Sequence, residues 1–207
     1  MQETKLNRLT ILYTANLNGD LQLLPRLYSY LQTLKAEQEN PVLLLDLGNS
    51  CAADVWHCAV TGGRSTLVVL DGMGYHAANV SDYLEASQRD KLRTSLTTGM
   101  VDELHSWRYH VPPVRDETVI VAGTESPALT LCIVAAIAPE TTINSRTLWL
   151  QGAEKGQVGL VEVDVPALKI LSSEIRDIPK GLKPDATIAA AVEFVEDEAR
   201  FLQKRSE

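Results

Sequence analysis

The sequence has few cysteines, no excess of basic residues and no long apolar run. Its three cysteines are Cys51, Cys58 and Cys132, an odd number that predicts no disulfide framework and suits a reducing compartment. The sequence contains 19 Lys and Arg and 27 Asp and Glu, which gives a net charge of −8. This balance argues against nucleic acid or an anionic membrane as the main partner, because both attract a basic face. No apolar run reaches the roughly 18 residues that span a bilayer.

The first residues also lack the features of a secretory signal. Residues 1–8 read Met-Gln-Glu-Thr-Lys-Leu-Asn-Arg, without an apolar stretch or a small-residue cleavage site. We therefore expect a cytoplasmic protein that makes no membrane contact.

What is present suffices for one packed domain. The chain has 207 residues, of which 45% are hydrophobic and 22% are charged. This composition excludes wholesale disorder, and the length fits one ordinary domain. We expect residues 1–207 to form a single domain.

The amino-terminal part has the pattern of a strand, a helix and a second strand. Residues 9–13 form a short apolar run that ends in a polar loop. A leucine stripe at helical spacing follows and predicts a helix over residues 25–37; its members are Leu24, Leu27, Leu31 and Leu34. Residues 42–46 are typical of a strand buried on both faces. The order predicts a parallel βαβ unit with residues 9–14 beside residues 42–46.

The remaining segments give a coarser pattern. Residues 82–104 predict a helix that is interrupted at Gly99, and residues 63–73 are ambiguous between helix and strand. Residues 111–114 read Val-Pro-Pro-Val and predict a rigid extended break. Strands are expected at residues 118–123, 129–137, 147–150, 156–165 and 168–175. A last helix is expected over residues 185–202, with Pro184 and Asp185 at its start.

Three segments each place Asn, Asp or Gly in a polar stretch beside an apolar run. Residues 12–19 read Leu-Tyr-Thr-Ala-Asn-Leu-Asn-Gly, residues 44–50 read Leu-Leu-Asp-Leu-Gly-Asn-Ser, and residues 73–84 read Met-Gly-Tyr-His-Ala-Ala-Asn-Val-Ser-Asp-Tyr-Leu. In this order they resemble three signatures of the metallophosphatase domain of 5'-nucleotidases, within the calcineurin-like metallophosphoesterase superfamily. Residues 148–160 and 182–185 resemble later parts of the same domain. The resemblance implies an α/β fold in which two mixed sheets form a sandwich flanked by helices.

The same resemblance implies a site for two divalent cations, but most of its ligands are replaced. The family's first Asp and first His fall on Asn16 and Asn18, its bridging Asp falls on Asn49, and its Gly-Asn-His-Glu places Asn and His on Asp82 and Tyr83. The family's late Gly-His-x-His motif has no counterpart between residues 137 and 149. None of the four histidines falls at a ligand position.

Neutral amides are poor substitutes for the missing carboxylates. Two divalent ions bring four positive charges, which amide oxygens do not offset, and a phenol with a pKa of about 10 is a poor ligand and proton donor at neutral pH. We therefore expect a vestigial site at the carboxyl ends of the strands, with no catalytic residue, metal or other cofactor. Its residues are Asn16, Asn18, Asn49, Asp82 and Tyr83. A bound divalent metal such as Mn or Zn is the alternative.

The leading hypothesis is a non-catalytic protein that has kept the fold and serves as a protein-interaction or structural subunit, through an unknown protein partner or self-association. Two alternatives stay open. One is a divergent metal-dependent phosphoester hydrolase with a site rebuilt from Asp46, Asp82, His57 and His76. The other is a nucleotide or phosphate sensor that binds in the old cleft.

Four further features are weighed against plainer interpretations. Cys51, His57 and Cys58 suggest zinc, but no second Cys or His pair completes four ligands, so ordinary buried side chains are favoured. Cys132 is expected to be a small buried hydrophobe. Residues 62–66 lack the lysine of a phosphate-binding loop and predict a turn before a helix. Residues 105–110, the densest aromatic and basic cluster, are expected to be a solvated helix end rather than an anion or partner site.

Overall fold

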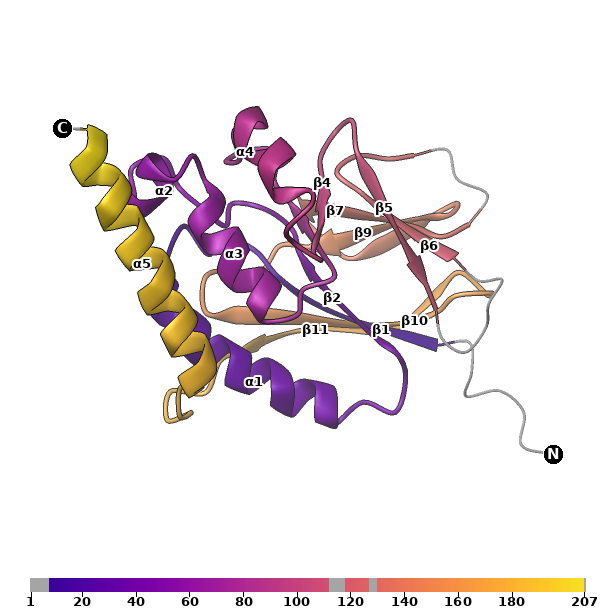
Figure 1. The fold of residues 1–207 in the computed structure, drawn as a ribbon. Helices are drawn as coiled ribbons and strands as arrows, with labels where there is room; N and C mark the ends of the chain where they lie inside the picture. The colour runs from indigo at the N-terminus through magenta and orange to yellow at the C-terminus, as the bar shows by residue number, and fades with distance from the viewer. Residues whose placement is uncertain (1–7, 112–117, 127–129, 207) are drawn as a thin grey trace.

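The computed structural model describes residues 8–111, 118–126 and 130–206. Two sheets pack face to face, and helices cover the outer side of the first (Figure 1). The first sheet has the strand order β11-β10-β1-β2-β3-β4 and the second the order β5-β6-β7-β9-β8. The strands are β1 (Arg8–Thr14), β2 (Val42–Asp46), β3 (Ala77–Asn79), β4 (Gly99–Val101), β5 (Ser106–His110), β6 (Thr118–Ala122), β7 (Cys132–Ala138), β8 (Thr142–Asn144), β9 (Thr147–Gln151), β10 (Gln157–Asp164) and β11 (Lys169–Asp177). The helices are η1 (Leu21–Leu23), α1 (Leu24–Ala36), α2 (Trp56–Val60), α3 (Arg64–Gly72), α4 (Ala86–Leu92) and α5 (Ala186–Ser206). The predicted fold class, a two-sheet α/β sandwich flanked by helices, is confirmed.

β1 and β2 are neighbouring parallel strands, with Leu12 beside Leu44 in the register. Both strands are buried on two faces, because Ile11 and Leu43 belong to the core between the sheets while Leu12 and Leu44 belong to the core under the helices. α1 joins the two strands in sequence and places Leu27 in this second core. The predicted βαβ unit is confirmed, and it fixes where the loops that follow β1 and β2 lie.

α5 is the outer helix of the helical layer and packs on α1, α2 and α3 (Figure 1). Its start is capped by Asp185, whose carboxylate accepts hydrogen bonds from the backbone N–H groups of Thr187 at 2.9 Å and Ile188 at 3.0 Å. The side chains that face inward recur at helical spacing and are buried: Ile188, Val192, Val195 and Ala199. The last predicted helix, including its start, is confirmed.

The predicted helix over residues 82–104 is wrong for most of its length. Only α4 is helical, and the chain then turns into β4. The Asp71 carboxylate accepts a hydrogen bond from the Thr98 N–H at 2.8 Å and holds that turn. Gly99 lies so close to the Trp107 indole that a Cβ atom there would collide with the ring. These tertiary contacts, which helical spacing does not report, decide the local structure.

The expectation of a helix end at residues 105–110 is also wrong, because β5 occupies all but the first of them. Exposed and half-buried side chains alternate along β5, as they do in a strand with one covered face. Trp107 and Tyr109 stack with ring centroids 5.9 Å apart, and both rings also contact His76. The aromatic cluster therefore packs on the edge between the two sheets.

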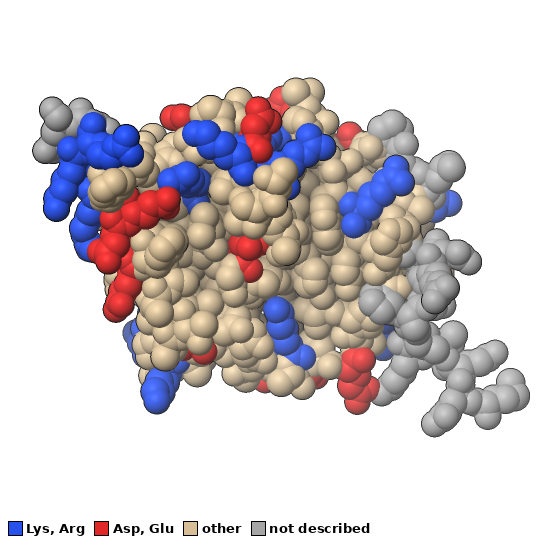
Figure 2. Space-filling model, viewed as in Figure 1, with Lys and Arg blue, Asp and Glu red and all other residues tan. Residues whose placement is uncertain are grey.

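The other predicted elements are found with small shifts of their bounds. The ambiguous residues 63–73 form α3, and the five later predicted strands correspond to β6, β7, β9, β10 and β11. Leu129 and residues 112–114 lie outside the described residues. On the face drawn in Figure 2, basic side chains gather over α4 and over the carboxyl end of α5, acidic side chains lie beside both groups, and much of the centre of this face carries neither sign. None of the described helices is both long and apolar enough to cross a membrane.

Candidate functional site

The loops that follow β1 and β2 run side by side at the carboxyl edge of the first sheet. Three backbone hydrogen bonds join them. The Asn16 N–H donates to Gly48 O at 3.1 Å, and the Asn18 N–H donates to Asn49 O at 2.8 Å. The Gly19 N–H donates to Ser50 O at 2.9 Å. The two loops therefore form one continuous paired structure, and it brings the first three candidate residues together.

All three asparagines have left-handed backbone conformations. Their φ angles are 55° for Asn16, 51° for Asn18 and 57° for Asn49. Among residues with a side chain, asparagine is one of the few that adopts this region readily. The residue type at these positions therefore suits the backbone path independently of any ligand.

Asn16 and Asn49 are also joined through their side chains. The Asn49 Nδ2 donates to the Asn16 Oδ1 at 2.9 Å, and the Asn16 Nδ2 donates to the Ala153 carbonyl at 3.0 Å. The Asn16 amide is thus engaged at both ends, and the link to Ala153 ties the paired loops to the segment between β9 and β10. Asn18 contributes its backbone, and its side chain is exposed.

Asp82 and Tyr83 follow β3 and lie along a neighbouring cavity of about 230 Å³. Asp82 is exposed, whereas the Tyr83 hydroxyl is buried and has no hydrogen-bond partner among the described residues. Burial, followed by the nearby charge of Asp46, raises the pKa of Tyr83 well above its ordinary value. Within the described part of the chain no hydrogen bond joins Asp82 to the asparagine pair, so the structure groups the candidates as an asparagine pair and a separate cavity wall.

Asp46 lies buried at the end of β2, beneath the paired loops. Its carboxyl group accepts hydrogen bonds from Ser50 Oγ at 2.5 Å, Thr14 Oγ1 at 2.9 Å and Gly48 N–H at 3.1 Å. Burial raises the pKa of Asp46 to about 7, against the opposing effect of these hydrogen bonds. Its contacts hold the loop after β2, which is a structural task.

The alternative hydrolase site is not assembled. His76 immediately precedes β3 while Asp82 follows it, so the two residues lie at opposite ends of that strand. The His76 Nδ1 accepts a hydrogen bond from the Leu44 N–H at 2.9 Å. Burial, together with the charge of Lys35, lowers the pKa of His76. The structure therefore does not bring the four residues of the alternative hydrolase site together in one cluster, and that hypothesis is wrong for the set Asp46, Asp82, His57 and His76.

The expectation about the cysteines needs one correction. Cys51 and Cys58 form a disulfide, with their Cα atoms 5.7 Å apart, within the range that such a bond requires. The spacing in sequence does not reveal this, because α2 must first fold back over the loop that follows β2. Cys132 is a free, buried residue of β7, as predicted, and burial raises its thiol pKa.

The glycines before α3 make the predicted turn, and it is confirmed. Gly62 and Gly63 have φ angles of 60° and 85°. A Cβ atom at Gly63 would lie 2.1 Å from the Tyr83 carbonyl oxygen. Gly63 is thus required by a close backbone approach that closes one wall of the 230 Å³ cavity.

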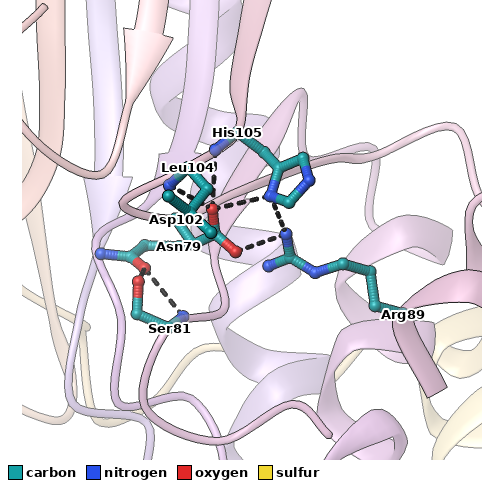
Figure 3. A network of polar contacts seen from close by, with 6 residues as sticks. All are labelled: Asn79, Ser81, Arg89, Asp102, Leu104 and His105. Carbon is teal, nitrogen blue, oxygen red and sulfur yellow. Dashed lines mark hydrogen bonds and ion pairs between the residues drawn. The ribbon is translucent and has the colours of Figure 1, made fainter. Parts of the chain in front are cut away.

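A second polar network, which is not among the sequence predictions, lies between α4 and the turn that joins β4 to β5 (Figure 3). Asp102 forms an ion pair with Arg89 and accepts a hydrogen bond from the His105 ring at 2.9 Å. Burial opposes ionisation of Asp102, but hydrogen bonds from the His105 side chain and from the backbone of Leu104 and His105 lower its pKa. The turn pattern Asp-x-x-His was its only signal in the sequence.

A cavity of about 290 Å³ lies beside this network. Arg89, Arg93, His105 and Trp107 are among the residues that line it. Because Arg89 and His105 are already paired with Asp102, the network mainly fastens α4 to the second sheet.

Comparison with known proteins reveals similarity at the level of structure alone. Neither a protein-family profile nor a curated protein sequence matches this chain. The NAD nucleotidase NadN of Haemophilus influenzae superposes with a TM-score of 0.62 at 10% identity, over 93% of this chain and 60% of that one. The sulfate thiohydrolase SoxB of Thermus thermophilus gives 0.63 at 11% identity, over 92% and 60%. A 5'-nucleotidase precursor from Thermus thermophilus gives 0.58 at 12% identity, over 95% and 60%.

This chain therefore spans about 60% of the length of each of these three proteins. A phosphatase from Mycoplasma pneumoniae, with a TM-score of 0.52 at 9% identity, is covered over 97% of its length. At such identities the likeness establishes the fold, which is metallophosphatase-like, as the sequence motifs imply.

The residues at the candidate positions do not fit the two-cation centre of the family that the sequence resembles. The Asn16 amide is engaged at both ends, and the donor set contains a single carboxylate, Asp82, for two ions that bring four positive charges. No reaction step through such a centre follows from this geometry.

Proposed function

We propose that this chain is a non-catalytic protein of metallophosphatase-like fold, which has lost the two-cation site and serves as a protein-interaction or structural subunit. One observation carries the proposal. Asn49 donates to Asn16, and Asn16 donates to the Ala153 carbonyl, so the amides use their hydrogen-bonding capacity to hold loops together. A fold outlives its site readily, because activity depends on a few side chains placed on it.

The exposed face of α5 supports the interaction role. Phe194 is 67% exposed and Phe201 is 59% exposed, and they are seven positions apart in the sequence, so they lie on one side of the helix. Two large aromatic side chains on one exposed helix face are a feature of protein contact surfaces. A second copy of the chain is the partner that is simplest to test.

We also propose the cytoplasm as the compartment. The net charge of −8 favours neither nucleic acid nor an anionic membrane as a partner. A reducing compartment would hold Cys51 and Cys58 as thiols, a state considered further below.

The loss of the cation site is tested by restoring the family's ligands. The variant Asn16→Asp with Asn18→His and Asn49→Asp should bind Mn²⁺ at least ~10-fold more tightly than the wild type, because two carboxylates and an imidazole replace three neutral amides. It should not gain hydrolysis of nucleoside monophosphates or p-nitrophenyl phosphate, because Tyr83 and the missing late histidines remain. Titration calorimetry and a phosphate-release assay with added Mn²⁺ measure the two quantities.

A matched control adds the same charge elsewhere. The variant Asn144→Asp with Gln151→Glu changes two exposed amides of the second sheet and should leave Mn²⁺ affinity unchanged. Turnover by the wild-type protein that requires Mn²⁺ and is abolished by Asp82→Asn would overturn the proposal. It would favour instead a phosphoester hydrolase, the activity class of the structurally similar 5'-nucleotidase and phosphatase.

The interaction role makes a separate prediction. The wild-type protein should form a heavier species as its concentration rises, and Phe194→Ser with Phe201→Ser should remain a single chain with an unchanged melting temperature. Light scattering after size-exclusion chromatography measures the mass. Leu104→Ser is the control, because Leu104 is 88% exposed but lies outside α5. A wild-type protein that stays a single chain at every concentration rejects self-association.

A further inference from the structure

Three potential metal ligands meet beside the candidate site, although none of them belongs to the family's cation centre. Cys51 comes from the loop after β2, while His57 and Cys58 come from α2. One ligand atom of each lies within 4.8 Å of the others. Their exposed fractions are 5%, 4% and 3%, so the cluster is held in place by packing rather than displayed on the surface.

The hydrogen bonds of His57 orient its ring for metal binding. The Nε2 atom lies 2.9 Å from the Gly19 carbonyl oxygen, which can only accept, so Nε2 carries the proton. The Nδ1 atom therefore carries the lone pair, which accepts a hydrogen bond from Ser65 Oγ at 2.7 Å and lies 3.7 Å from Cys58 Sγ, so an ion at Nδ1 would take the place of the Ser65 hydroxyl. A ring N–H on a backbone carbonyl, with the second nitrogen toward the ion, is the usual arrangement of a metal-bound histidine.

The surroundings of the two sulfur atoms favour negative charge. Cys51 Sγ lies 3.3 Å from Thr66 Oγ1 and 3.5 Å from Ser65 Oγ. Both hydroxyl groups belong to the first turn of α3, where the helix dipole also stabilises anions. The Thr66 hydroxyl and the amino end of α3 can therefore stabilise a thiolate at Cys51, and the Ser65 hydroxyl can join them once His57 Nδ1 binds an ion.

We propose that, once the Cys51–Cys58 bond is reduced, the two thiolates and His57 Nδ1 hold one Zn²⁺ ion. A dithiol reductant supplies two electrons, the Sγ–Sγ bond breaks, and the reductant leaves as its own disulfide. Binding of Zn²⁺ then releases the two thiol protons to solvent. The sulfur atoms need only separate to about 3.8 Å to share a tetrahedral ion with Zn–S bonds of about 2.3 Å.

The charge of the complex suits its burial. Two thiolates and one neutral imidazole around a divalent ion sum to zero, so no net charge is placed in the buried cluster. The fourth position opens on the 230 Å³ cavity, which Cys51, Cys58, Asp82 and Glu85 all line. A water molecule is the ligand that keeps the complex neutral, and the two carboxylates draw the cation into the cavity. The site shares no ligand with the Asn16–Asn49 pair, so it stands or falls independently of the proposed loss of the family's centre.

Cobalt substitution tests the site directly. Wild-type protein reduced with a phosphine in the absence of oxygen should bind one equivalent of Co²⁺. It should show a sulfur-to-cobalt charge-transfer band and the intense visible bands of a tetrahedral ion, and Zn²⁺ should displace both. His57→Gln keeps both cysteines and should lower the affinity by at least about 10- to 100-fold, the loss typical of removing a group that only orients a ligand. Cys51→Ser and Cys58→Ser should each remove the charge-transfer band or halve it, and oxidised protein should bind no cobalt.

Matched variants separate this site from other causes. His76→Gln and Cys132→Ser change a histidine and a cysteine outside the cluster and should leave the cobalt spectrum unchanged. The proposal is overturned if reduced wild-type protein shows no tetrahedral cobalt spectrum, or if the spectrum survives in His57→Gln and in both cysteine variants. Circular dichroism confirms that each variant is folded. If a cysteine variant does not fold, His57→Gln and the comparison of oxidised with reduced wild-type protein still decide the outcome.

Discussion

Asn16, Asn18 and Asn49 all have φ angles between 51° and 57°, and that shared conformation limits which residues can replace them. Most L-residues pay about 1–2 kcal/mol in this region, whereas asparagine and aspartate tolerate it. An exchange between Asp and Asn therefore keeps the backbone path while it removes a metal ligand. Such exchanges leave the paired loops closed, which the proposed loss of the cation site requires.

The buried carboxyl group of Asp46 should make the free energy of unfolding depend on pH. Its pKa is about 7 in the folded protein, raised mainly by burial from an ordinary value of 3.8. The folded protein thus binds this proton more tightly than the unfolded chain, so the stabilising contribution is complete below about pH 4 and is lost as the pH rises through 7. The loss amounts to roughly 4 kcal/mol at most. Urea unfolding between pH 4 and pH 8 measures it.

The variant Asp46→Asn isolates this effect from the titration of other groups. An asparagine mimics the protonated acid, because its Nδ2 can donate to Thr14 Oγ1 while its Oδ1 keeps the bonds from Ser50 and Gly48. The free energy of unfolding of the wild type, minus that of Asp46→Asn, should fall as the pH rises from 4 to 7. Asp54→Asn, at an exposed position, should show no such trend. A constant difference for Asp46→Asn would mean that the buried carboxyl group is ionised throughout.

At the scale of elements, the sequence predicts the helices and strands whose buried side is marked by the spacing of their own apolar residues. β2 is a continuous apolar run, and α1 and α5 carry apolar stripes at helical spacing, so their type follows from local sequence alone. The segment after β3 is different. Its course depends on Asp71 holding the turn at Thr98 and on the fit of Gly99 beneath Trp107, and such contacts leave no periodic signal.

The candidate site divides in the same way. Each asparagine follows a predicted parallel strand, and strand ends of that kind meet at one edge, so the contact between the loops could be anticipated from the motifs. The approach of Cys51 to Cys58 and the orientation of His57 toward Gly19 could not. They require α2 to dock against both loops and against the first turn of α3. A helix of five residues is too short for its apolar spacing to indicate where it packs.

At the scale of the whole molecule, a polar contact of Asn79 joins the two sheets across their apolar core. Asn79 at the end of β3 is 7% exposed, and its Nδ2 donates to the Ala135 carbonyl of β7 at 2.6 Å. That carbonyl lies at a shift in the register between β7 and β9. The Asn79 Oδ1 accepts hydrogen bonds from the backbone N–H and the hydroxyl group of Ser81 (Figure 3). Asn79 thus fastens one sheet to the other at a place where the strand ladder is interrupted.

This link makes the expected single domain testable as one cooperative unit. In a Trp56→Phe background, the fluorescence of Trp107 and Trp149 reports the second sheet, while far-UV circular dichroism reports mainly the helices on the first. Both signals should give one midpoint in urea, as coupled sheets require.

Asn79→Ala leaves the buried Ala135 carbonyl without its partner, so it should lower the free energy of unfolding by about 1–3 kcal/mol and shift both midpoints equally. Asn144→Ala, at an exposed position of β8, should shift neither by more than ~0.5 kcal/mol. Two separate midpoints, or a shift confined to one signal, would divide the chain into independently folding sheets, because a contact shared by one cooperative unit cannot weaken only half of it.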